Sequence, residues 1–228
     1  MLADEENFGS LAHINRELIG KVEAVNSSQR VVLDMDSTEI PVYSQQEQSA
    51  YNGRFESTCY HPLLLFNREG DCLAARLRPG NAHSADDCEE LPLPEIERQQ
   101  KPGKEVVFRA DAAFAKPEVY EALEARGVKY AIRIPANDSL ERDIAELLTR
   151  PVEGRATSRW CGTRVWGAAK VEFHFGELFP HVGFIATKLE TDRRAAVRFY
   201  NKRAAGRETL NLFNECAEAI IGCKMAGS

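Results

Sequence analysis

Two runs of apolar residues, each followed by an aspartate, constrain the fold of this chain more than any other feature. The first run lies in Arg30–Asp36 and the second in Glu105–Arg109, with Asp111 two residues beyond it. Such runs are typical of strands that are buried on both faces of a sheet covered by helices. The sequence therefore predicts an α/β fold with a mixed sheet flanked by helices, in which Asp36 and Asp111 follow two buried strands.

The composition is that of a globular protein. The 228 residues are 43% hydrophobic and 28% charged, which is ordinary for a soluble domain. No apolar stretch approaches the roughly 18 residues that a membrane-spanning helix needs, and the acidic start of the chain is unlike a secretory signal peptide. We therefore expect a cytoplasmic protein without a membrane partner.

The six cysteines are scattered, without the paired spacing of a zinc site, and are expected to be free thiols.

Helical and strand periodicities alternate along the chain. Helices are expected over residues 15–25, 84–100, 117–126, 138–148, 194–202 and 210–224, and strands over 30–36, 62–66, 72–77, 105–109, 128–134, 171–175 and 182–189. The helical segment 84–100 is expected to be interrupted by Pro92 and Pro94. Gly70 is expected in the turn of a hairpin, and Asp138 with Glu141 as a capping box. Residues 41–60 are interpreted as an irregular excursion, and residues 151–169 show no pattern.

Charge is unevenly distributed along the sequence. The net charge is −6, which argues against a nucleic-acid partner, but residues 150–207 hold twelve Lys or Arg and five Asp or Glu. This local excess of positive charge allows a DNA-facing surface. On charge alone, a solvated face is the better explanation.

Asp36 and Asp111 are candidate metal ligands. In open α/β sheets, ligands gather beyond the carboxyl ends of the strands, and two carboxylates there suit Mg²⁺ or Mn²⁺. Two such ions can activate a water or a 3′-hydroxyl for phosphodiester chemistry. Acidic residues also occur at strand ends simply because the loops that follow are exposed to solvent. For either aspartate alone, that explanation is the stronger. Arg78 and His83 lie in a loop that could approach such a site, although both residue types are more often structural.

Several short motifs together resemble one family. They are, in order, Leu33-Asp34-Met35-Asp36-Ser37-Thr38-Glu39, Gln45-Gln46, Tyr51-Asn52-Gly53, Tyr60-His61-Pro62-Leu63-Leu64-Leu65, Arg76-Leu77-Arg78-Pro79-Gly80-Asn81-Ala82-His83-Ser84 and Arg109-Ala110-Asp111-Ala112-Ala113-Phe114. The motifs resemble those of the DDE transposases of bacterial insertion sequences, over residues 7–150 and again over residues 170–203.

The resemblance implies a ribonuclease-H-like fold and DNA transposition, with Asp36 and Asp111 as catalytic metal ligands. The cofactor would be Mg²⁺ or Mn²⁺, and the partners would be the ends of the insertion element and target DNA, with a homodimer in the intact family. The chain would then divide into a helical lead-in (1–29), the catalytic core (30–150), a degenerate and partly β insertion (151–190) and divergent C-terminal helices (191–228).

The late part of the chain departs from the family pattern, which is Tyr-x2-Arg-x3-Glu-x6-Lys. Tyr200 and Arg203 match it and are candidate contacts to a DNA phosphate. The Glu position falls on Arg207 and the Lys position on Asn214, with Glu208 one residue late. One residue is a rotation of about 100° on a helix, so Glu208 is a displaced candidate for the third catalytic acid. The mismatch suggests a truncated or frame-shifted copy with impaired activity.

Two other functions remain open. One is an inactive transposase remnant with at most nonspecific DNA binding. The other is a haloacid-dehalogenase-like phosphatase, because Asp34-x-Asp36-x-Thr38 after an apolar run also presents a nucleophile and a general acid. That family needs a later acidic pair at the end of a strand, and Asp86-Asp87 follows no apolar strand.

Overall fold

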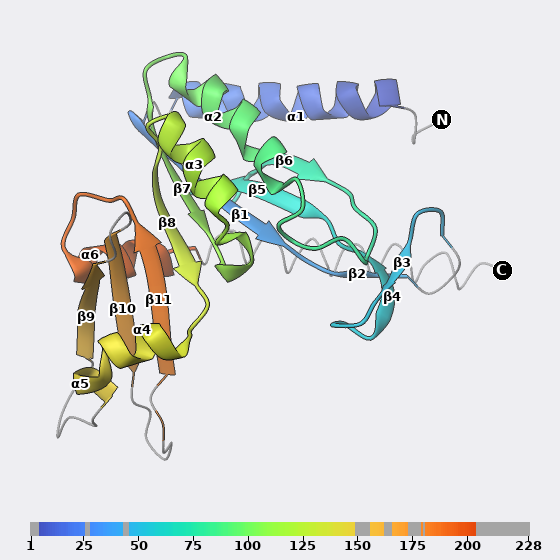
Figure 1. The fold of residues 1–228 in the computed structure, drawn as a ribbon. Helices are drawn as coiled ribbons and strands as arrows, with labels where there is room; N and C mark the ends of the chain where they lie inside the picture. The colour runs from blue at the N-terminus through green and yellow to red at the C-terminus, as the bar shows by residue number, and fades with distance from the viewer. Residues whose placement is uncertain are drawn as a thin grey trace. The chain divides into compact units, whose positions relative to one another are not determined.

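The computed structural model describes residues 5–25, 28–42, 46–148, 156–161, 166–172, 179 and 181–203. These residues form two compact units, of which the first ends at Val106 and the second runs from Val107 to Arg203. Figure 1 shows the elements of both, and each unit is described separately. Among the described helices, none has the length and apolar character needed to cross a membrane. The helix expected over residues 210–224 lies outside the described residues, and the four-part division of the chain stays a prediction.

The first unit contains an antiparallel sheet in the order β6-β5-β1. Its strands are β1 (Arg30–Ser37), β5 (Leu63–Asn67) and β6 (Cys72–Arg76). The apolar run of β1 is buried as expected, with Leu33 0% and Met35 1% exposed. Gly70 has a φ of 96° in the turn between β5 and β6, which confirms the expected hairpin and its glycine.

A second, smaller sheet lies in residues 40–60, where an irregular excursion was expected. It has the order β2-β4-β3, with β2 (Ile40–Pro41), β3 (Ala50–Asn52) and β4 (Ser57–Tyr60). The expectation was wrong because strands this short carry no detectable alternation. Gly80 packs against this sheet: a Cβ at this position would overlap the carbonyl oxygens of Ala50 and Cys59, so only glycine fits.

Helices α1 (Glu5–Val25) and α2 (Pro92–Gln100) belong to the first unit, with the short helix η1 (Cys88–Glu90) before α2. The side chain of Glu23 joins the two helices, because it accepts hydrogen bonds from Gln99 Nε2 and Lys104 Nζ, each at 3.3 Å. Pro92 begins α2 instead of interrupting a longer helix, in the first turn where proline is tolerated. On α1, Ile19 is buried, whereas Ile14, Leu18 and Val22 are exposed.

The second unit is built on a mixed sheet in the order β7-β8-β11-β10-β9. The strands are β7 (Glu105–Ala110), β8 (Lys129–Ile134), β9 (Ala156–Cys161), β10 (Trp166–Glu172) and β11 (His181–Thr187). β7 and β8 are parallel, and the other pairs are antiparallel. β9 and most of β10 therefore lie in the stretch where the sequence showed no pattern.

Helices cover both faces of this sheet. They are η2 (Ala112–Phe114), α3 (Pro117–Ala125), α4 (Asp138–Asp143), α5 (Ala145–Leu148) and α6 (Arg193–Asn201). Leu140 of α4 packs in one cluster with Phe184, and Val197 of α6 packs in another with Ile185. Phe184 and Ile185 are neighbours on β11 and point to opposite faces, so α4 and α6 lie on opposite sides of the sheet.

The N-terminus of α4 differs from the expected capping box at Asp138 and Glu141. The cap is Asn137, whose side-chain oxygen accepts from the N–H groups of Ser139 and Leu140. Both Asn and Asp are good N-cap residues, and the structure uses the one that comes first.

Candidate active site

Asp36 lies near the end of β1 in the first unit and is half-buried. One of its carboxylate oxygens accepts a hydrogen bond from the backbone N–H of Ser37 at 3.0 Å. Ser37 in turn donates from its hydroxyl to Ser84 Oγ at 3.3 Å. The structure thus ties the residue after Asp36 to the loop that contains Arg78 and His83.

Arg78 organises this loop from inside. Its guanidinium is buried and donates to the carbonyl oxygens of His61, His83 and Asp86 at 3.0 to 3.2 Å. Burial lowers the pKa of the Arg78 guanidinium, and the nearby Asp86 carboxylate partly offsets this. Among the described residues, its Nη2 has no hydrogen-bond partner. Arg78 therefore holds the loop beside the end of β1 through backbone carbonyls.

His61 adds a second polar anchor to the same loop. Its ring Nδ1 donates to the carbonyl oxygen of Ala82 at 2.9 Å, and its Nε2 lies 3.5 Å from Ser84 Oγ. Burial lowers the pKa of His61, and the positive charge of Arg78 acts in the same direction. The neutral ring is therefore the form that the folded loop favours.

Asp111 lies directly after β7 in the second unit and is half-buried. Its carboxylate oxygen accepts from the backbone N–H of Ala113 at 2.9 Å, which makes Asp111 the N-cap of η2. A carboxylate has about four acceptor positions, so this single bond leaves capacity for a cation. The local backbone therefore fixes the direction of the Asp111 side chain without saturating it.

Arg109 is a residue whose role the sequence did not reveal. It lies in β7, two residues before Asp111, and only 1% of it is exposed. Its guanidinium donates to the carbonyl oxygens of Phe199 and Lys202 at the end of α6. The sequence could have indicated this role, because an arginine inside a buried apolar strand needs buried hydrogen-bond acceptors for its guanidinium.

Tyr200 lies in the last turn of α6 in the second unit, and Arg203 lies two residues beyond the end of this helix. Arg203 is buried and donates from Nη1 to the Tyr200 hydroxyl at 3.2 Å, with its guanidinium 5.7 Å from the centre of the Tyr200 ring. The two residues therefore form one structural pair. Their contact with a DNA phosphate stays a prediction.

Within the described residues, no group of three or more His, Cys, Asp or Glu side chains converges on one point. Glu208, the displaced candidate for the third acid, lies outside the described residues. Asp36 belongs to the first unit and Asp111 to the second, so their convergence on a shared ion stays a prediction. In donor chemistry both fit a hard divalent cation, which prefers carboxylate oxygens.

The acidic pair considered for a phosphatase lies in a turn. Asp86 accepts from the backbone N–H of His83 at 3.1 Å, and Asp87 has a φ of 47°.

Three of the cysteines, Cys59, Cys72 and Cys88, are free thiols as expected. Burial raises the pKa of Cys88 to about 12, so its thiol is protonated at neutral pH.

Comparisons with known proteins bear on the family and the fold of this chain. The family described as transposase DDE domain group 1 matches residues 1–210. No curated protein matches the sequence. Among solved structures, a piggyBac transposase synaptic complex with hairpin DNA, determined by cryo-EM, matches with a TM-score of 0.52 and 12% identity. The match covers 80% of this chain and 40% of that chain, and it confirms the expected ribonuclease-H-like fold class.

Proposed function

Because this chain belongs to the transposase DDE domain group 1 family, we propose that its function is DNA transposition. In the intact family this is metal-dependent cleavage and joining of DNA strands at the ends of an insertion element, and we propose that this chain is impaired because Arg207 and Asn214 occupy the Glu and Lys positions of the family motif. One observation supports this most. Asp36, the second-to-last residue of β1, and Asp111, directly after β7, each follow a buried apolar run, and in each a backbone N–H donates to a carboxylate oxygen. Rigidly held carboxylates at strand ends are what a site for phosphodiester chemistry requires.

In this proposal Asp36 and Asp111 hold the divalent ions that the family uses, with Mg²⁺ or Mn²⁺ as the ion in this chain. Such an ion supplies charge stabilisation at the phosphate and lowers the pKa of a bound water. The third ligand would come from the region after Arg203, with Glu208 as the candidate.

In this proposal, one contact in each unit restricts the backbone next to these carboxylates. The Arg78 loop contacts Ser37 through Ser84 and so restricts the end of β1. Arg109 fixes the last strand residues before Asp111 against α6. Tyr200 and Arg203 at the end of α6 are the proposed contacts to the DNA phosphate.

The proposed partners are the element ends and target DNA, and a homodimer is proposed for the intact protein.

The test uses a plasmid that carries the DNA flanking this coding sequence, because an insertion element is bounded by its own ends. The chain is given the family motif by Arg207→Glu and Asn214→Lys and is incubated with the plasmid and Mg²⁺ or Mn²⁺. Cleavage at the flanks is expected, and it should fall at least about a hundredfold in Asp36→Asn and in Asp111→Asn. Cleavage that both variants retain would refute the assignment of the aspartates.

Membership of the family favours transposition over the phosphatase alternative. Turnover of a small phosphate ester that depends on Asp36, without any cleavage of DNA, would reverse that preference. The inactive remnant differs in another way: it would bind DNA without cleavage even when the motif is restored.

A further inference from the structure

Three basic side chains of the second unit share one face of the sheet. Strand register pairs Ile185 of β11 with Arg133 of β8, and Gly183 of β11 with Lys170 of β10. Paired residues point to the same face, and so do residues two apart on one strand. Arg133, Lys170 and His181 therefore belong to the face that carries Ile185, which is the face covered by α6.

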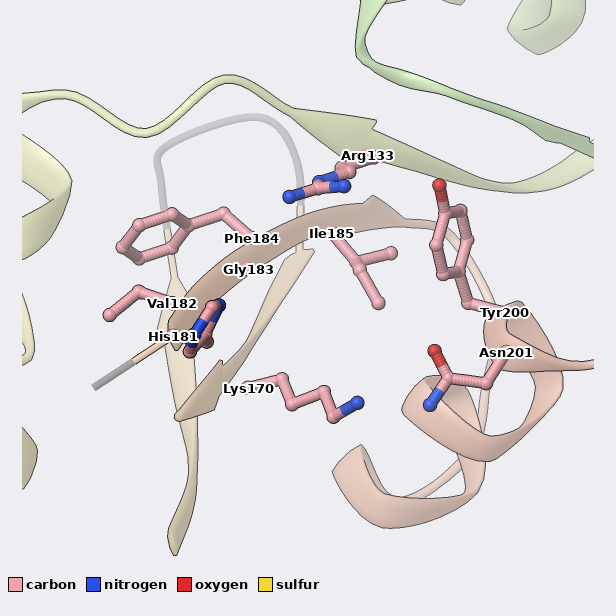
Figure 2. A pocket seen from close by; sticks show the side chains of 9 residues that line it. All are labelled: Arg133, Lys170, His181, Val182, Gly183, Phe184, Ile185, Tyr200 and Asn201. Carbon is pink, nitrogen blue, oxygen red and sulfur yellow. The ribbon is translucent and has the colours of Figure 1, made fainter. Parts of the chain in front are cut away.

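A cavity of about 230 Å³ lies on this face beside the end of α6. Its lining includes the three basic side chains together with Tyr200 and Asn201 of α6. Figure 2 shows the amino end of Lys170 and the amide of Asn201 on the same side of the cavity, with the Arg133 guanidinium across from them. Five side chains that can donate hydrogen bonds therefore line this cavity.

Gly183 creates part of the space. It lies opposite Lys170 in the sheet, and a Cβ added at this position would have no heavy atom within 4 Å. The glycine is not needed for the backbone, because its φ lies outside the positive range that glycine favours. A larger side chain would therefore fit and would fill the cavity.

The charge of the lining is positive. Among the nine described residues that line the cavity, none is acidic. Arg133, which is exposed, and Lys170, which is half-buried, are the two cations on which the argument rests.

The end of a helix carries partial negative charge, which would oppose an anion here. In this structure the carbonyl oxygen of Phe199 accepts from Lys202 N and Arg109 Nη1, and that of Tyr200 accepts from Arg203 N. The positive charge of Arg109 also lies at this helix end. These donors and the Arg109 charge offset part of the negative charge at the carbonyl end of α6.

From this geometry we propose that the cavity binds a phosphate group of the DNA backbone, with Arg133 and Lys170 as the charged ligands and Asn201 as a neutral donor. The inference rests on the proposed function, since it takes DNA as the substrate. It extends that function, because it assigns a strand-holding role to the β8–β10–β11 face of the second unit. Contacts to phosphate carry no sequence information directly, so binding at the cavity should be independent of the DNA sequence.

The test measures binding of a short fluorescent DNA duplex by anisotropy over a series of salt concentrations. Arg133→Gln and Lys170→Gln should each weaken binding roughly 3- to 10-fold and reduce the slope of log K against log salt by about one. Gly183→Leu should weaken binding as well, although it changes no charge. Lys116→Gln is the matched control, because it removes one charge from an exposed site of the same unit outside the cavity. Circular dichroism verifies that each variant folds.

The outcomes separate the two proposals. Loss of affinity in both charge variants and in Gly183→Leu, with Lys116→Gln unchanged, supports the cavity as the phosphate site. If Gly183→Leu binds like the wild type, or if Lys116→Gln weakens binding as much as Lys170→Gln, the cavity is not the site. In that case the aspartate-dependent cleavage tested above still stands. A folded wild-type chain that binds no duplex at low salt contradicts both proposals.

Discussion

Arg109 donates a hydrogen bond from Nη1 to the carbonyl oxygen of Phe199 at 2.6 Å, and its guanidinium lies 4.8 Å from the centre of the Phe199 ring. The two residues are 90 positions apart in the sequence. The contact joins β7, which leads to Asp111, to α6, which carries Tyr200. Two candidate site residues of the second unit therefore depend on one buried arginine for their relative placement.

Replacing Arg109 should destabilise the second unit. Arg109→Met keeps an apolar stem but removes the charged hydrogen bonds to α6, so we expect a loss of about 2 to 4 kcal/mol in the free energy of unfolding. Urea unfolding followed by circular dichroism measures it. Arg142→Gln is the control, since Arg142 is an exposed arginine that also donates to a backbone carbonyl, and it should change stability by less than about 0.5 kcal/mol. Equal stability of the two variants would contradict a linking role for Arg109.

Two glycines of the first unit provide a matched pair. A Cβ at Gly80 would overlap the carbonyl oxygens of Ala50 and Cys59, whereas a Cβ at Gly53 meets nothing within 4 Å. Gly80→Ala should therefore cost about 2 kcal/mol or more, because backbone must move, and Gly53→Ala should be nearly neutral. Thermal unfolding of the two variants side by side measures the difference. Similar melting temperatures would mean that the loop at Gly80 adapts without cost.

His61 predicts a pH dependence of stability. Its pKa in the folded state lies below the ordinary value of about 6.5, mainly because of burial. The unfolded chain therefore takes up the proton first as the pH falls, so this contribution is complete above about pH 6.5 and is lost below it. Urea midpoints between about pH 7.5 and 5 should fall more steeply for the wild type than for His61→Gln. Parallel curves would show that His61 titrates normally in the folded protein.

The two buried strands and their aspartates were predictable because long apolar runs leave a clear signal. β1 and β7 lie within one residue of the expected bounds, and Asp36 and Asp111 follow the apolar runs as expected. The strands β2, β3 and β4 were not predictable, because each has two to four residues and is defined by its pairing partners. The same holds for the cavity: Arg133 and Lys170 come together only through the register of β11 with β8 and β10.

Metal binding by this chain should be weak. Two carboxylates leave most of the six-coordinate shell of Mg²⁺ or Mn²⁺ to water, so loose binding is expected. Calorimetry with Mn²⁺ should show affinity that is lost in Asp36→Ala and in Asp111→Ala, while Asp143→Ala serves as an exposed acidic control. Sub-micromolar affinity would mean that a third ligand, with Glu208 as the candidate, completes the site.

The unmodified chain should perform no strand cleavage or transfer by itself. In the family pattern the third acid would occupy the position of Arg207, and here that position carries the opposite charge. The reaction requires both ions to be held rigidly, and loss of one ligand from a preorganised site lowers the rate by orders of magnitude. The purified chain, incubated with a plasmid that carries the flanking DNA and Mg²⁺ or Mn²⁺, should therefore leave the plasmid intact, whereas the variant with Arg207→Glu and Asn214→Lys should nick it. Nicking by the unmodified chain that disappears both in Asp111→Ala and in Glu208→Ala would overturn this prediction, and it would show that Glu208 serves as the third acid despite its shifted position.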